Sequence, residues 1–156
     1  MGVKMYSLEV LKATRKKFIA LIDSLSFDEL NKIPAGFNNN IVWNFGHAIV
    51  SGYLLCYVST TVDVTVKIPF VDKYRKGTKP ETFVNKDEVE ILKKASDDFF
   101  VLLEKDLSEN KFQHITPYAT QTFGVEMQTI EDDIITIFGH DTLHYTTAVN
   151  MKRIVK

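Results

Sequence analysis

Two histidines stand four residues apart in the segment GHDTLH, at His140 and His144. On an α-helix, residues at this spacing lie on the same face one turn apart, so both imidazoles could reach one ion. Neutral imidazole is a common ligand of zinc and other transition metals. A lone His-x-x-x-His pair is nevertheless a weak signal, because it also arises by chance.

A third histidine, His47, is the best candidate to complete such a site. It shares an apolar helical face with Trp43 and Val50. Helical bundles build metal sites from side chains on facing helices, and a catalytic zinc site usually has three protein ligands and one open position. The sequence therefore predicts a metal site formed by His47, His140 and His144.

Spacing alone favours a simpler alternative, in which all three are core or surface histidines satisfied by hydrogen bonds. Burial shifts the weight toward a metal, because each imidazole on an apolar face needs a polar partner and one ion would serve all three. The fourth histidine, His114, lies in the polar segment KFQHITPYAT. It is expected to be a solvated loop residue.

Four other side chains have a weaker claim to a role in the site, and no residue is assigned as catalytic. Asp141 could accept an imidazole N–H, or it could make a polar contact within the bundle. Tyr118 and Tyr145 could reach the mouth of the site, although tyrosines at helical spacing are more often packing residues. Cys56 is expected to be a buried core thiol without activation.

Amphipathic helices must position these residues, and the 3.6-residue period predicts four long ones. Their expected spans are residues 6–25, 41–59, 86–107 and from about 129 to the end. In the first, Arg15 is expected on the charged face, opposite the apolar one. The predicted fold is an all-α four-helix bundle with long inter-helix connections, forming one domain over residues 1–156.

Local signals refine the ends and the connections of these helices. Ser26 and Glu29 form a predicted capping box that opens a short helical turn, and the asparagines at 38–40 are candidate N-caps. Residues 60–83 read as a long loop in which alternating valines leave a strand hairpin as the lesser alternative. Residues 108–125 read as a second connection.

The composition indicates a globular protein and argues against some partners. The 156 residues are 45% hydrophobic and 25% charged, with a net charge of −1. This balance predicts neither nucleic-acid nor anionic-membrane binding. Cys56 is the single cysteine, and the start MGVKMYSLEV lacks the pattern of a secretory signal, so a cytoplasmic location is expected. The apolar stretch from Ile41 is interrupted by polar residues and fits a buried helix better than a membrane span.

Three segments resemble the DinB-like superfamily: NNNIVWNFGHAIV, YRKGTKPE and FGHDTLHYTTAVNMKRIVK. This superfamily groups small four-helix proteins with the DNA-damage-inducible DinB proteins of bacteria and the YfiT-like proteins, which are regarded as metal-dependent enzymes. The resemblance covers nearly the whole chain and is most specific at residues 43–47 and at the last two histidines. It implies that His47, His140 and His144 bind a divalent metal, with zinc or nickel expected.

Two departures from the family pattern concern the wall of the pocket. The last helix of relatives often reads His-Glu-x-x-His-x-Gly-Gln, whereas here Asp141 follows the first histidine, and Thr146 and Thr147 stand where Gly-Gln is common. The ligands are kept, but the wall is expected to differ, which weakens any transfer of a substrate from relatives. The family name records induction by DNA damage and implies neither a polymerase nor DNA binding.

Three functions remain open at this point. Some relatives are transferases or isomerases that use a low-molecular-weight thiol such as bacillithiol or mycothiol, so the first is a metal-dependent thiol S-transferase or hydrolase-like enzyme. The second is a non-catalytic metal- or small-ligand-binding bundle. The third is a structural bundle whose histidines bind no metal. A homodimer through helix faces is possible and is seen among relatives.

Overall fold

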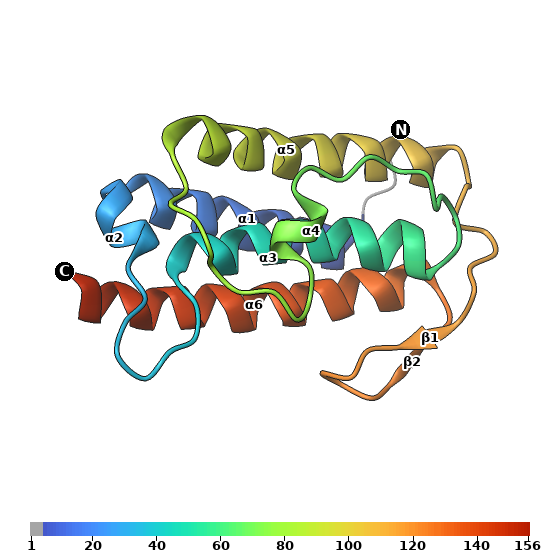
Figure 1. The fold of residues 1–156 in the computed structure, drawn as a ribbon. Helices are drawn as coiled ribbons and strands as arrows, with labels where there is room; N and C mark the ends of the chain where they lie inside the picture. Colours follow the sequence, from blue (N-terminus) through green and yellow to red (C-terminus); the bar gives the residue numbers. More distant parts are fainter. Residues whose placement is uncertain (1–4) are drawn as a thin grey trace.

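The apolar and charged periodicities of the chain become helices in the computed structural model, which describes residues 5–156 (Figure 1). The helices are α1 (Tyr6–Asp23), α2 (Phe27–Asn31), α3 (Ile41–Tyr53) continued by the π-helix η1 (Leu54–Ser59), α4 (Val71–Tyr74), α5 (Lys86–Ser108) and α6 (Ile130–Val155). The two strands are β1 (Tyr118–Ala119) and β2 (Glu126–Met127), which pair antiparallel. The all-α prediction is confirmed, and α1, α3, α5 and α6 run lengthwise beside one another.

Side-chain caps fix where the helices begin. The predicted capping box is present, because the Ser26 hydroxyl accepts from the Glu29 amide and the Glu29 carboxylate accepts from the Ser26 amide. Asn40 caps α3 by accepting from the Trp43 amide at 2.9 Å. Such caps satisfy amides that have no partner inside the helix.

Helix α3 lies at the centre of the core. All of its residues from Ile41 to Tyr53 are buried, in contacts with α1, α5 and α6. A helix that is apolar on every side must be buried on every side. The segment Ile41–Ser59 is long and apolar enough to cross a membrane by length and composition alone, but 83% of its most apolar window is buried within the protein, as in a core helix.

The two long connections differ in detail from their predicted form. Between residues 60 and 83 there is no strand in the described chain, and the short helix α4 occurs instead. The alternating apolar residues there, Val62, Val66 and Ile68, pack against the core while Val64 is exposed. The period-two pattern therefore reflects neither strand pairing nor burial of a single side, because Val64 shares the alternation and is exposed. The hairpin lies in the second connection and at its end, at β1 and β2.

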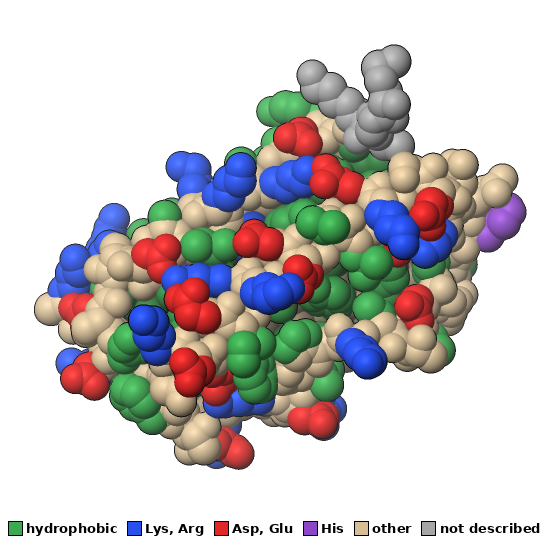
Figure 2. All heavy atoms as spheres, turned by 90° about the horizontal axis from the view of Figure 1, so that it is seen from above, with side chains coloured by type: hydrophobic (Ala, Val, Ile, Leu, Met, Phe, Trp, Pro, Cys, Tyr) green, Lys and Arg blue, Asp and Glu red, His purple; other side chains and the backbone are tan. Residues whose placement is uncertain are grey.

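The face that carries α5 mixes charges of both signs, with apolar side chains between them (Figure 2). Ion pairs on it include Lys93 with Asp23 and Glu90, and Lys94 with Asp98. Exposed pairs of this kind contribute about 0–1 kcal/mol each. The ion pairs on this face therefore contribute little to the folding stability of the protein.

Candidate metal centre

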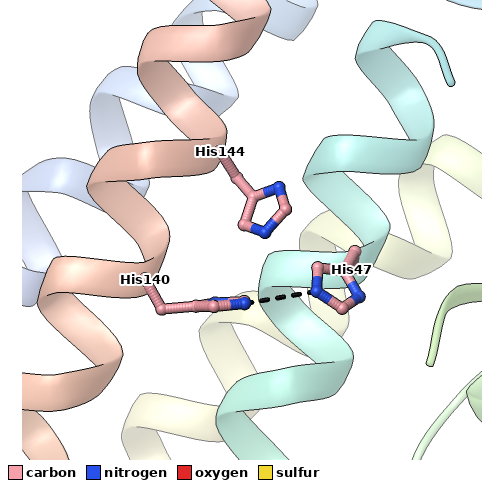
Figure 3. A group of neighbouring side chains, drawn as sticks. All are labelled: His47, His140 and His144. Carbon is pink, nitrogen blue, oxygen red and sulfur yellow. Dashed lines mark hydrogen bonds between the residues drawn. The ribbon is translucent and has the colours of Figure 1, made fainter. Parts of the chain in front are cut away.

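The packing of α3 against α6 brings three histidines together, as the sequence predicted. His47 comes from α3, and His140 and His144 come from successive turns of α6 (Figure 3). One ring nitrogen of each histidine lies within 4.8 Å of the other two. His47 is buried and the other two are half-buried, so the cluster sits between the helices with one side accessible.

The His47 imidazole is oriented by the backbone of α4. Its Nδ1 lies 2.7 Å from the carbonyl oxygen of Tyr74. A carbonyl can only accept, so Nδ1 carries the proton and Nε2 presents a lone pair to the cluster. The Trp43 ring stacks on the other side of this imidazole, with centroids 4.6 Å apart and planes 9° apart. These contacts hold His47 in a tautomer that can coordinate an ion.

Asn44 orients His144 in the same way. Its side-chain oxygen lies 2.8 Å from Nδ1 of His144. Its amide nitrogen donates to Asn39 Oδ1 at 2.9 Å and to the Asn40 carbonyl at 2.8 Å, so its oxygen is the acceptor toward the histidine. Nδ1 of His144 is therefore protonated, and Nε2 is free. Sequence reasoning missed this role, although a polar residue on a fully buried helix face was the available signal.

His140 completes the cluster. Its Nε2 lies 3.2 Å from Nε2 of His47, and its Nδ1 is buried with no hydrogen-bond partner in residues 5–156. Two nitrogens that bind one tetrahedral zinc ion at ~2.0–2.1 Å stand about 3.3–3.4 Å apart. The observed separation of these two nitrogens therefore suits two ligands of one ion.

Burial makes the three imidazoles neutral at physiological pH. Desolvation, reinforced by the neighbouring histidines, lowers the pKa of His140 to about 3 and of His144 to about 4. Desolvation also lowers the pKa of His47. Only the neutral imidazole coordinates a metal, so these groups need not lose a proton first near pH 7.

A close contact between α3 and α4 holds the Tyr74 carbonyl in place. A Cβ atom at Gly46 would lie 2.5 Å from a carbon of the Tyr74 ring, nearer than real Cβ contacts come. The ring is buried against this glycine, and its hydroxyl donates to Glu88 Oε1 at 2.5 Å. Gly46 is thus required for α4 to approach closely enough to meet His47.

Asp141 does not contact an imidazole, so its predicted role as an acceptor for a histidine N–H is wrong. Its Oδ2 accepts from Arg15, at 2.9 Å from Nε and 2.7 Å from Nη2, which is the alternative of a polar contact within the bundle. Arg15 is 1% exposed, so its predicted place on the charged surface of α1 is also wrong. Its guanidinium also reaches Ser96 Oγ at 3.2 Å and the Ala48 carbonyl at 3.4 Å. This buried ion pair ties α1 to α6 beside the histidines.

A pocket of about 400 Å³ opens beside the cluster. Its lining combines apolar, hydroxyl and amide side chains with one lysine: His47, Ser51, Leu54, Leu55, Ser59, Lys76, Tyr118, Ala119, Thr120, Gln121, Thr122, His140 and His144. The wall comes from η1, from the loop after α4 and from the hairpin. A pocket of this volume admits a small organic molecule as well as an ion.

The π-helix shapes one side of this pocket. In η1 the regular helical hydrogen bonding changes, and the Leu55 carbonyl accepts from the Tyr118 hydroxyl at 2.9 Å. Single-turn π segments of this kind are frequent at functional sites. The contact attaches the hairpin to α3, so the start of β1 becomes part of the pocket wall.

Of the other candidate residues from the sequence, one lines the pocket and three do not. Tyr118 lines the pocket, whereas the Tyr145 ring packs edge-on against Phe18. His114 is exposed and outside the cluster, as predicted. Cys56 is a buried thiol whose pKa is raised by burial, so it is not an activated nucleophile.

Thr146 and Thr147, expected to alter the pocket wall, are not among the lining residues. The Thr147 hydroxyl bonds the Leu143 carbonyl of its own helix.

Asp133 is a buried acid in the first turn of α6. Its side chain is fully buried, and neither oxygen has a hydrogen-bond partner in the described chain. Burial raises the pKa of its carboxyl from 3.8 to about 7, although the nearby Tyr118 hydroxyl opposes the shift. A carboxyl kept neutral in this way loses its proton only at a cost in folding stability.

Replacing Asp133 with asparagine should stabilise the protein above neutral pH. Between pH 3.8 and about 7 the folded state keeps a proton that the unfolded state has lost, so the wild type loses stability as the pH rises through this window. The advantage of the variant should grow from near zero at about pH 4 to on the order of 4 kcal/mol at about pH 8. Urea unfolding across this range measures it. The same change at exposed Asp97 is the control, and an equal response there would contradict the prediction.

Comparison with known proteins agrees with this picture. The helical fold and the three-histidine cluster at a pocket define a class of small helical proteins with a candidate metal centre. A model of the DinB superfamily matches residues 11–148, and the chain belongs to this superfamily. The match includes all three histidines. No curated protein matches the chain.

Proposed function

We propose that this protein is a single-domain DinB-type four-helix bundle in which His47, His140 and His144 hold a divalent ion, zinc or nickel. The observation that carries the proposal is the pair of hydrogen bonds on the far side of the rings: the Tyr74 carbonyl and the Asn44 side-chain oxygen each accept a hydrogen bond from an Nδ1–H. They leave Nε2 of His47 and His144 as lone-pair donors, the second-sphere arrangement common around metal-bound histidines.

We further propose that the centre belongs to a thiol S-transferase or a hydrolase-like enzyme that uses a low-molecular-weight thiol or water. A bound divalent ion lowers the pKa of a coordinated thiol or water and so supplies a nucleophile at neutral pH. The three histidines would leave one coordination position facing the pocket. Leu54 and Leu55 would limit the access of bulk water, and the hydroxyls of Ser51 and Ser59 would orient the second substrate.

One observation favours the second candidate, a non-catalytic metal- or ligand-binding bundle. The pocket lining contains no carboxylate that could serve as a general base, and Asp141 is engaged by Arg15. Thiol transfer needs no such base once the thiol is ionised, whereas hydrolysis gains from one. Between the two enzymatic options, the lining therefore favours thiol transfer.

We also propose that the protein is cytoplasmic, that it binds neither nucleic acid nor membranes, and that it forms a homodimer.

Metal analysis of untagged protein tests the centre. After loading with zinc or nickel and dialysis, the wild type should retain about one ion per chain, and a His144→Ala variant should retain below about 0.1. The same change at exposed His114 is the matched control and should leave binding intact. Equal retention in all three proteins would contradict the proposed ligands.

Turnover tests the reaction class. Metal-loaded protein should accelerate the reaction of an electrophile with a low-molecular-weight thiol, and a chelator should abolish the acceleration. Turnover that survives in His144→Ala would contradict a metal-dependent enzyme. Full metal loading with no acceleration for any thiol or ester would favour the binding protein.

A further inference from the structure

We propose that the molecule bound in the pocket carries an oxyanion, of which a carboxylate is the simplest, and that Lys76 pairs with it. The inference rests on the proposed metal centre. One end of the molecule would carry the oxyanion beside Lys76, and its other end would occupy the open coordination position of the metal ion. It adds the substrate class: an anion with an apolar segment between its charged group and its metal-binding end.

The charge of the site is the first argument. Three neutral imidazoles bring no negative charge, so a divalent ion held by them would keep its full charge. None of the residues that line the pocket is an aspartate or a glutamate. The buried carboxylate of Asp141, which follows His140 in the chain, is already paired with Arg15. An anionic ligand is the simplest way to balance this charge.

Lys76 is the second argument. Among the residues that the structure describes (5–156), it is the single lysine or arginine in the lining of the pocket. Its ammonium bonds the side-chain oxygen of Gln121, which is a neutral partner, and it forms no ion pair within residues 5–156. Lys73, three residues earlier, pairs with Glu88 at 2.8 Å. The positive charge of Lys76 therefore remains available to an anion in the pocket.

The rest of the lining fits the two ends of such a molecule. Thr120 and Thr122 lie with Gln121 on the hairpin loop and can donate hydrogen bonds to an oxyanion. Leu54 and Leu55 lie on η1, which continues the helix that carries His47, and present an apolar surface. An anion without an apolar segment would leave this surface unused.

Thiols that coordinate cobalt provide a direct test. Protein loaded with cobalt(II) gives a visible spectrum that changes when a thiolate takes the open position. It is titrated with ω-mercapto carboxylates of increasing chain length and with the matching amides. At the best length, the carboxylate should bind about 5–10-fold more tightly than its amide, as expected for a partly exposed charged pair. Lys76→Met should remove this preference without changing cobalt content.

The controls separate the possible failures. Lys79→Met, an exposed lysine that does not line this pocket, should keep the preference. No preference for the carboxylate in wild-type protein that binds cobalt would overturn the inference and leave the metal centre standing. The inference would also be overturned, with the metal centre left standing, if Lys76→Met weakened the binding of the carboxylate and of the amide equally. Failure to bind cobalt at all would instead overturn the proposed centre.

Discussion

Replacing Arg15 with methionine should lower the free energy of unfolding by about 3–5 kcal/mol, a large part of the ~5–15 kcal/mol typical of a domain. The guanidinium and the Asp141 carboxylate are both essentially excluded from water, at 1% and 0% exposure. Without Arg15, the carboxylate would be left buried and unpaired. Asp141 would then have to take up a proton or draw water into the core. Urea unfolding followed by circular dichroism measures the loss.

A double variant separates the ion pair from the space it fills. Arg15→Met combined with Asp141→Leu removes both charges and should recover most of the lost stability, because apolar replacements of buried pairs are often neutral or stabilising. Lys94→Met, which breaks the exposed pair with Asp98, should cost less than about 0.5 kcal/mol. A loss below about 1 kcal/mol in Arg15→Met would show that the pair matters little.

Replacing Gly46 with alanine should damage both stability and metal affinity. The added Cβ would lie 2.5–2.7 Å from three carbons of the Tyr74 ring, so α4 would have to move away from α3. Overpacking of this kind costs about 1–3 kcal/mol. Because α4 supplies the carbonyl that orients His47, metal affinity should fall about 10–100-fold, as when other such partners are lost. Chelator competition measures the affinity.

The same helix offers a matched control at Gly52. A Cβ there would lie 3.5 Å from the nearest atom, a carbon of the Phe99 ring, which is ordinary contact. Gly52→Ala should be neutral, or stabilising by up to about 1 kcal/mol through its helical propensity, with metal affinity unchanged. If Gly46→Ala bound metal as tightly as Gly52→Ala, the positioning role of α4 would be wrong.

The three histidines were predictable because helical periodicity fixes the faces on which they lie. His140 and His144 share one face of α6, and His47 lies on the apolar face of α3 with Trp43 and Val50. Capping signals such as Ser26 and Asn40 likewise act over three or four residues, so they were readable locally. The family resemblance pointed to the same three residues and added the expected metals, zinc or nickel.

The partners of the histidines were not predictable, because they depend on contacts between segments far apart in the chain. A backbone carbonyl carries no sequence signal, so the acceptor at Tyr74 could not be found by residue type. Arg15 follows the pattern of a surface charge, and its burial is offset by partners far away in the chain, chiefly the carboxylate of Asp141. The hairpin at β1 also escaped, since its strands of two residues are too short to show alternation.

His47 is oriented by a backbone carbonyl, and such a contact is hard to detect in the sequences of relatives. Every amino acid at position 74 would supply the same carbonyl, so substitutions there can preserve the contact and leave no trace of it. The residue that records the contact is the glycine at 46, where any side chain would force the two segments apart when an aromatic ring occupies position 74. In homologues, covariation of positions 46 and 74 should therefore indicate that the histidine at position 47 is held in the same orientation. Neither side chain forms the hydrogen bond to that histidine, because the backbone carbonyl of residue 74 accepts it.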